Sequence, residues 1–379
     1  MGIRLTWEGL RELAAFRAEN GCAISLYLNL DPSVTPTPAA AEARARSLLD
    51  EAAKRADASL SELTHEQRLA FRADLDRIRR FVELDLDRDG AQGYAVFAAS
   101  LDNLWRPLPL TGAVPDAVTV RRDLYLSPLV RLVGAGEGAL VVHVGRERGD
   151  FYRLQGGKLV AVADRSEEQP RRHDQGGWSQ ANFQRHVDNL AHSHLRAVAE
   201  EIDRQLRRLG PQPVVILSTE EVRAELAGLL HNDARAAVVG WTQAEAHASP
   251  AELLALAAPI LEAWRLERER SVLARWREEA ATGGRAASGW AETLEAASDG
   301  RVEILLYEER ANRAAFRCPA CGRLQLEGGK CPLDGTELEE REEGIDLVVH
   351  QTLVHGGTAL VVTGRDLESV GGIGAILRY

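Results

Sequence analysis

The spacing of hydrophobic residues along the first third of the chain alternates between a helical period and a strand period. Long stretches with apolar residues three and four apart are separated by short apolar runs, the patterns of amphipathic helices and of partly or fully buried strands. We therefore expect an α+β domain over residues 1–132. The expected helices cover residues 5–20, 39–58 and 64–84, and the expected strands cover residues 22–30 and 94–99.

The pattern from residue 133 to 266 is that of an α/β domain. Residues 213–217 form a continuous apolar run, as in a parallel strand that is buried on both faces. The other expected strands cover residues 139–144, 150–154, 158–162 and 236–239, and the expected helices cover residues 219–230 and 250–275.

Residues 267–379 have the pattern of a third α/β domain. A helix is expected over residues 289–297, with strands over 302–307 and 359–363, and a cysteine-rich insertion interrupts the domain at about residues 317–340. Residues 345–350 fit a helix by context, but their composition also allows a strand. The predicted fold class is therefore α/β (α+β) with three domains, 1–132, 133–266 and 267–379.

A loop and a long helix stand out in the middle domain. Ser179 is a good N-cap residue, and the apolar stripe that follows has steps of three and four residues. Gly176 and Gly177 precede it, and they allow the backbone to approach another molecule closely. Because the start of a helix carries unpaired N–H groups and a positive dipole end, the loop would suit a phosphate-rich or carbonyl partner. The stripe comprises Phe183, Val187, Leu190, Ala191, His194, Val198 and Ile202.

Basic and aromatic side chains surround this loop. We take Arg171, Arg172, Trp178, Gln180 and Arg185 as candidate RNA-binding residues, because an indole stacks on any base and arginines neutralise phosphates. The alternative is a simple helix-entry turn in which Trp178 packs on its own domain.

Three cysteines and an aspartate have the spacing of a zinc ribbon. Cys318 and Cys321, then Cys331 and Asp334, each lie three residues apart in the turn Cys-Pro-x-[Cys/Asp]-Gly. Zinc accepts a carboxylate ligand, although a fourth thiolate is more usual. We expect a structural zinc site, with His350 or His355 as alternative fourth ligands and an empty, degenerate ribbon as the alternative to metal binding.

Four histidines, His173, His186, His192 and His194, lie within 22 residues. No two are four residues apart, so a metal site on one helix face is not favoured. Acid–base cleavage of RNA would need two of them to converge, and solvated or core histidines are the simpler interpretation.

Charge and hydropathy narrow the class of partner. The chain has 379 residues and a net charge of −11, which argues against a dedicated binder of duplex DNA. No apolar run reaches the roughly 18 residues that a membrane span needs, and the N-terminus lacks the apolar region of a signal peptide. We therefore expect a cytoplasmic protein with no membrane partner.

Three stretches together resemble one family, the class-I peptide-release factor of archaea and eukaryotes with its paralogue Pelota. The loop at Gly176 and its helix are similar to the family's Gly-Gly-Gln-Ser sequence. Residues 290–307 resemble the opening helix and strand of the family's third domain, and residues 371–379 resemble its end. Order and spacing match across the whole chain. We identify the chain as a divergent bacterial member, similar to the hibernation factor Balon and to Vms1-like proteins.

The resemblance implies a placement for each domain on the ribosome. The middle domain would reach toward the peptidyl-transferase centre, the first toward the decoding site, and the third would bind a translational GTPase such as elongation factor Tu. Two departures change the expected activity. Trp178 stands where the family has its catalytic Gln, which positions water and stabilises the oxyanion at the peptidyl-tRNA ester, and the first domain has no Asn-Ile-Lys-Ser stop-codon motif.

The sequence therefore favours a binder of the ribosomal A site, acting in hibernation or rescue without stop-codon decoding and with little or no catalysis. Gly176, Gly177, Trp178 and Ser179 form the loop tip that would carry any remaining activity. The first alternative is an esterase that frees peptide from peptidyl-tRNA on stalled ribosomes, and the second is an RNA nuclease that uses the histidine cluster.

Overall fold

The computed structural model describes residues 5–59, 63–88, 90–134, 136, 138–166, 179–209 and 212–379. The chain forms two compact units, one made of Met1–Gly134 with Glu267–Tyr379 and one made of Ala135–Leu266. The predicted first and third domains thus share a unit, and their separation into two domains stays a prediction.

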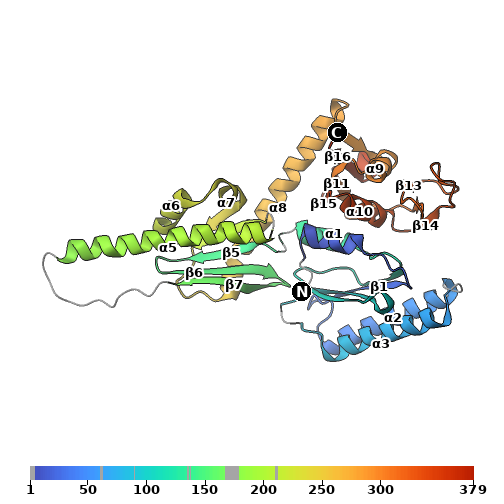
Figure 1. Ribbon diagram of the computed structural model, residues 1–379, viewed down its shortest axis with the longest axis horizontal. Coiled ribbons are helices and arrows are strands. Elements are labelled where there is room, and N and C mark those ends of the chain that lie inside the picture. The colour runs from blue at the N-terminus through green and yellow to red at the C-terminus, as the bar shows by residue number, and fades with distance from the viewer. Residues whose placement is uncertain are drawn as a thin grey trace. The chain divides into compact units, whose positions relative to one another are not determined.

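The first part of the discontinuous unit is an antiparallel four-stranded sheet in the order β3-β2-β1-β4. Helices α2 and α3 lie side by side on one face (Figure 1), over Ile24, Leu26 and Leu28 of β1. The elements are α1 (Trp7–Ala15), β1 (Ala23–Asn29), α2 (Pro38–Ser59), α3 (His65–Leu84), β2 (Gly93–Ala99), η1 (Ser100–Asp102), β3 (Leu104–Leu110), β4 (Ala117–Arg121) and α4 (Ser127–Gly134).

The second part of this unit has a mixed sheet in the order β10-β16-β11-β15, in which only β11 and β15 run parallel. The cysteine module, residues 315–341, is a separate small sheet in the order β13-β12-β14. The elements are β10 (Ala286–Ser288), α9 (Gly289–Ser298), β11 (Val302–Glu308), β12 (Ala315–Arg317), β13 (Leu324–Gln325), β14 (Glu339–Arg341), α10 (Gly344–Val354), β15 (Thr358–Val362), η2 (Glu368–Val370) and β16 (Ile373–Leu377).

One hydrophobic core joins these two parts. Tyr27 and Phe97, on the face of the first sheet opposite α2 and α3, belong to the same buried cluster as Leu305 of β11 and Val348 of α10. Because residues from both ends of the sequence fill this core, neither part would keep its apolar face buried alone.

A buried ionic network crosses the same contact. Asp346, on α10, accepts hydrogen bonds from the N–H groups of Leu126 and Ser127, both at 2.9 Å, and pairs with Arg121 at 2.9 Å. Arg317 of β12 pairs with Asp123 at 2.7 Å. The carboxylate of Asp346 thus caps the start of α4, although it lies 219 residues further along the chain. It accepts the hydrogen bonds that an N-cap side chain would otherwise accept.

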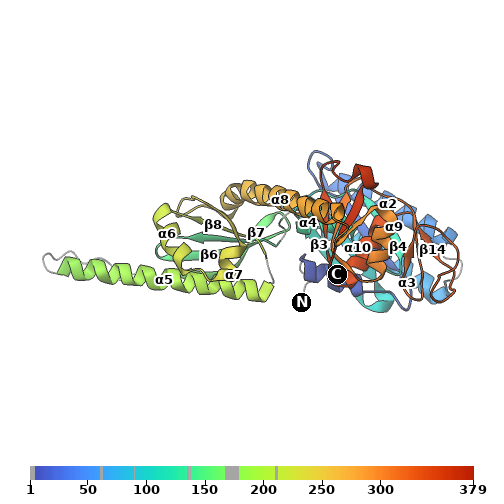
Figure 2. The same ribbon diagram turned by 90° about the horizontal axis from the view of Figure 1, so that it is seen from above.

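The continuous unit is a five-stranded sheet in the order β7-β6-β5-β8-β9, with β5, β8 and β9 parallel. Every residue of β8 is buried, as its continuous apolar run predicts. Helices α5, α6 and α7 cover one face, and the first half of α8 covers the other (Figure 2). The elements are β5 (Leu140–Val144), β6 (Arg148–Gln155), β7 (Lys158–Ser166), α5 (Ser179–Leu209), β8 (Val214–Ser218), α6 (Glu220–Leu229), α7 (Asn232–Ala237), β9 (Val238–Thr242) and α8 (Pro250–Ala281).

Several predicted elements are wrong in extent or type. The first helix ends at Ala15, because the backbone of Phe16 is extended and that of Arg17 forms an antiparallel β-bridge with Asp123. The strand expected at 236–239 begins only at Val238, after the short helix α7. The charged run at residues 339–343, whose composition predicts a solvated linker, contains the strand β14. The open case at 345–350 is a helix, α10.

The burial of His350 predicts that the stability of the discontinuous unit depends on pH. It lies on α10 with 6% of its surface exposed, and its two ring nitrogens have no hydrogen-bond partner among the described residues. Burial lowers its pKa from 6.5 to about 4; nearby Asp123 opposes the shift, and Arg317, Arg121 and Arg17 reinforce it. The unfolded chain therefore takes up the proton first as the pH falls.

Above pH 6.5 the His350 imidazole should not affect the free energy of unfolding. Between pH 6.5 and pH 4 we expect that free energy to fall by roughly 3 kcal/mol. In His350→Leu this part of the pH dependence should disappear, whereas His65→Gln, at an exposed site, should keep it. Urea unfolding at several pH values measures this. An unchanged pH profile in His350→Leu would show that the residue does not titrate as described.

Candidate functional site

The loop that the sequence singles out can be placed only in part. Arg171, Arg172, Gly176, Gly177 and Trp178 lie outside the described residues, and so do the side chains of Ser179, Gln180 and Arg185. The helix α5 does begin at Ser179, as the N-cap pattern predicts within a residue, and it runs for 31 residues. The backbone N–H groups of its first turn therefore follow the loop directly.

The apolar stripe of α5 packs on the sheet. Ala191, His194, Val198 and Ile202 are buried, together with Leu195 and Ala199; the side chains of Phe183 and Val187 lie outside the described residues. This burial fixes the described part of α5 along the sheet face.

The described histidines of α5 do not converge. His192 is exposed and contacts Glu225 of α6 at 2.7 Å through Nδ1, whereas His194 is 1% exposed. The two rings therefore lie on different sides of the helix, as their spacing predicts. His173 and the side chain of His186 lie outside the described residues.

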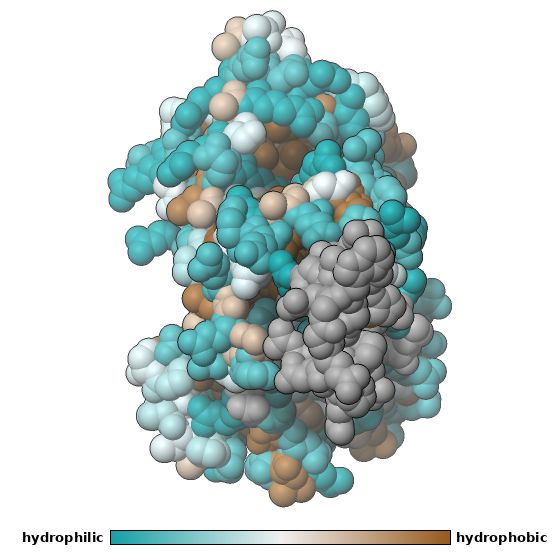
Figure 3. All heavy atoms as spheres, turned by 90° about the vertical axis from the view of Figure 1, so that its left-hand side faces the viewer, coloured by the Kyte–Doolittle hydropathy of each residue, from teal (hydrophilic) through white to brown (hydrophobic). Residues whose placement is uncertain are grey.

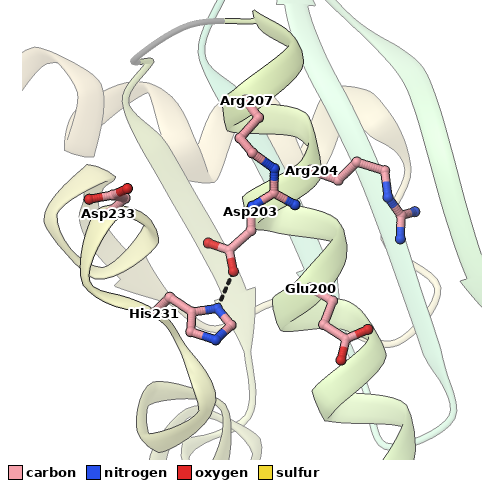
Figure 4. A pocket seen from close by; sticks show the side chains of 6 residues that line it. All are labelled: Glu200, Asp203, Arg204, Arg207, His231 and Asp233. Atoms are coloured by element: carbon pink, nitrogen blue, oxygen red, sulfur yellow. Dashed lines mark hydrogen bonds and ion pairs between the residues drawn. The ribbon is translucent and has the colours of Figure 1, made fainter.

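A groove of about 420 Å³ lies between α5 and the segment that links α6 to α7. The Asp203 carboxylate contacts Nδ1 of His231 (Figure 4). The sequence gives no signal for this pair, because its members are 28 residues apart and join only when the helices pack. The lining residues are Glu200, Asp203, Arg204, Arg207, His231 and Asp233.

The charges of this groove do not suit RNA cleavage. The lining residues include three carboxylates and two arginines, and His231 is the one histidine among them. Acid–base cleavage of RNA by paired histidines needs a second imidazole and a basic surrounding for the phosphate.

Hydrophilic residues dominate the surface drawn in Figure 3, where apolar residues form small, separate patches. None of the helices in the described ranges combines the length and hydropathy that a bilayer crossing needs.

The cysteine module contains the same turn twice. The N–H of Gly322 donates to the carbonyl of Cys318, and the N–H of Gly335 donates to that of Cys331, both at 2.9 Å. Both glycines have a positive φ, +80° and +75°, a conformation that strains other residues. Asp334 thus takes in the second turn the place that Cys321 takes in the first.

The two turns bring four potential ligand atoms together. The sulfurs of Cys318, Cys321 and Cys331 and a carboxylate oxygen of Asp334 all lie within 4.8 Å of one another, and the Sγ atoms of Cys321 and Cys331 are 3.5 Å apart. Tetrahedral zinc with bonds of about 2.3 Å to sulfur would separate its ligands by about 3.8 Å. The donor set therefore fits a tetrahedral ion and could hold a metal.

The electrostatics of this cluster also fit a cation. The backbone N–H and the hydroxyl of Thr336 hold the pKa of Asp334 well below its ordinary value, so its carboxylate is ionised. The expected alternatives, His350 and His355, are not in the group: His350 lies near Asp123, and His355 contacts Gln351 at 3.1 Å.

Comparisons with known proteins place the chain in a class. Two archaeal proteins called peptide chain release factor subunit 1 are similar to it. The protein from Archaeoglobus fulgidus is 27% identical over 284 residues, covering 67% of this chain and 69% of the relative. The protein from Methanobrevibacter smithii is 24% identical over 298 residues, covering 70% and 72%. Over about two thirds of its length the chain is thus similar to archaeal peptide chain release factors.

A family description and solved structures add to this class. Residues 125–262 match the family described as bacterial archaeo-eukaryotic release factor family 10. The archaeal translation termination factor aRF1 aligns over 100% of this chain and 99% of its own, with 15% identity and a TM-score of 0.28. Dom34 of S. cerevisiae aligns over 76% and 81%, with 13% identity and a TM-score of 0.41.

Proposed function

We propose that the protein is a ribosome-binding translation factor that occupies the A site of idle or stalled ribosomes, in hibernation or rescue, without decoding a stop codon. The observation that carries the proposal is the match of residues 125–262 to a release-factor family, a range that contains both the Gly176-Gly177 loop and α5. The sequence relatives are named for peptide chain release, which is chemistry of the same ribosomal site.

The loop residues are assigned as a contact with RNA. Arg171 and Arg172 would neutralise phosphates, and Trp178 would stack on a base of rRNA or tRNA, an interaction worth about 1–3 kcal/mol. Gln180 and Arg185 follow in the first two turns of α5 and would extend this contact. We propose a structural zinc ion for Cys318, Cys321, Cys331 and Asp334, and a translational GTPase such as elongation factor Tu as the partner of residues 267–379.

Ribosome binding is the first test. We expect the purified protein to co-sediment with ribosomes, and Arg171→Glu/Arg172→Glu to lower its affinity about tenfold or more, because phosphate contacts dominate such binding. The matched control is Arg207→Glu/Arg208→Glu, which reverses the same number of charges. Arg207 and Arg208 are adjacent, exposed and near the C-terminal end of α5.

Equal loss of ribosome binding in both double variants would refute the assignment of the loop as the contact. No co-sedimentation of the wild type, with empty or with peptidyl-tRNA-loaded ribosomes, would refute the proposed function itself.

Peptide release separates the binder from the esterase. The wild type should release peptide from loaded ribosomes no faster than buffer, because an indole at position 178 would crowd the place of the nucleophile. Trp178→Gln should release it faster by up to about 10²–10³-fold, the usual contribution of one oxyanion-type donor. The control is Trp178→Ala, which removes the indole without adding the amide. Rapid release by the wild type would make the esterase the better proposal.

The nuclease is the least supported alternative. Among the described residues the histidines of α5 point to different sides, and the one groove histidine, His231, stands among carboxylates.

A further inference from the structure

We propose that the cysteine module is a peroxide-sensitive site, in which Cys321 and Cys331 join in a disulfide and the metal is expelled. This inference rests on the metal site proposed above, and it adds a covalent modification and a chemical class of reactant, a peroxide. It depends on how three thiols and one carboxylate are arranged.

The three thiols differ in access to solvent. Cys321 is exposed, whereas Cys318 and Cys331 are buried. Because bound zinc would keep all three sulfurs deprotonated, access decides which thiolate is oxidised, and a peroxide in solution meets Cys321 first.

The three thiols also differ in their neighbours. The Sγ of Cys331 lies 3.5 Å from that of Cys321, so the pair needs to close by only about 1.5 Å to reach the 2.05 Å of a disulfide. The Sγ of Cys318 also lies within 4.8 Å of the Cys321 sulfur, but it contacts the two carboxylate oxygens of Asp334 at 3.4 and 3.6 Å and accepts the N–H of Cys321 at 3.4 Å. Cys331 is thus the better resolving thiol, although Cys318 is nearer to Cys321 in sequence.

The reaction balances with one peroxide. The thiolate of Cys321 attacks a peroxide oxygen, the O–O bond breaks, and the leaving hydroxide takes a proton to form water. The sulfenic acid left on Cys321 is then attacked by the thiolate of Cys331; the S–S bond forms, the S–O bond breaks, and a second water leaves after protonation. Two thiolates lose two electrons in total, and the peroxide gains them.

The disulfide removes two of the four metal donors. Asp334 cannot form a disulfide, so three thiols yield one disulfide and one free thiol, that of Cys318. Only Cys318 and Asp334 then remain as donors, and two ligands do not make a closed tetrahedral site. A site with four cysteines would have no such unpaired remainder.

The test uses the full-length chain loaded with zinc and titrated with hydrogen peroxide. Free zinc is followed with a chromogenic chelator, and thiols are mapped by alkylation and peptide mass spectrometry. We expect one zinc to be released for every two thiols lost, a disulfide between Cys321 and Cys331, and Cys318 still open to alkylation after denaturation. A dithiol reductant with added zinc should restore the starting state.

Two variants serve as controls. Cys22→Ser removes the thiol outside the cluster and should change nothing, whereas Asp334→Cys supplies a fourth thiol and should yield a second disulfide, between positions 318 and 334. A disulfide that contains Cys318 in the wild type, or zinc release without any disulfide, would overturn the inference. Zinc that stays bound when peroxide is in excess would overturn it while leaving the metal site intact, and a chain that never binds zinc would overturn both.

Discussion

Asp346→Ala should lower the free energy of unfolding of the discontinuous unit by about 3–5 kcal/mol, the usual cost of removing one partner from a buried ion pair. The substitution leaves the Arg121 guanidinium, whose side chain is 8% exposed, without its nearest anion. It also leaves the N–H groups of Leu126 and Ser127 without an acceptor. Urea unfolding measures the change.

Two further variants give this prediction its contrast. Asp346→Asn keeps an oxygen for the two N–H groups but loses the charge, so its cost should be smaller, about 1–3 kcal/mol. Glu309→Ala breaks the ion pair with Arg131, which joins the same two parts of the sequence but is more than half exposed on both sides, and should cost at most about 1 kcal/mol. Equal losses for Asp346→Ala and Glu309→Ala would show that burial of the network contributes nothing.

Removal of the proposed zinc should loosen the cysteine module. Its strands have three, two and three residues, and its own core comprises Cys318, Cys331 and Leu338 with Phe316 packed against them. A sheet this small is at best marginally stable in water alone, and its other support is the packing of Ala315 and Leu324 into the shared core. Structural zinc supplies an apparent ~10–16 kcal/mol in comparable small modules.

We expect about one zinc per purified chain and a sharp loss of zinc in Cys321→Ser, with new protease cleavage between residues 318 and 338. Elemental analysis and limited proteolysis measure the two effects. Cys22→Ser is the control, because this half-buried thiol lies in the first part of the chain, outside the cluster. Freshly reduced protein without zinc would contradict the prediction.

The sequence predicted the elements whose apolar period is clear. Local pattern alone predicts the buried run at 213–217, the amphipathic stripe of α5 and the paired Cys-Pro-x-[Cys/Asp]-Gly turns. The expected donor atoms of Cys318, Cys321, Cys331 and Asp334 also lie close together. Strands β3 and β4 are not among the predicted elements; Pro107 and Pro109 lie within β3, which is an edge strand, a position where proline is tolerated.

What escaped prediction depends on contacts between distant parts of the chain. Arg121 and Asp346 are separated by 225 residues, and nothing near either residue indicates a partner. The same holds for Asp203 and His231, which are an ordinary helix carboxylate and an ordinary loop histidine until α5 and α7 pack.

The shared core has a consequence for the order of events during synthesis. The chain leaves the discontinuous unit at Gly134 and re-enters it at Glu267, so 132 residues emerge from the ribosome between the two halves of one hydrophobic core. At roughly 5–20 residues per second this interval lasts about 7–26 s. During that time the apolar face that carries Tyr27 and Phe97 has no covering layer from α9, β11 or α10, while the inserted unit already has its complete sequence. This connectivity implies that the inserted unit folds before the discontinuous unit does. It also implies that the exposed apolar face of the first sheet must be protected from aggregation during this interval.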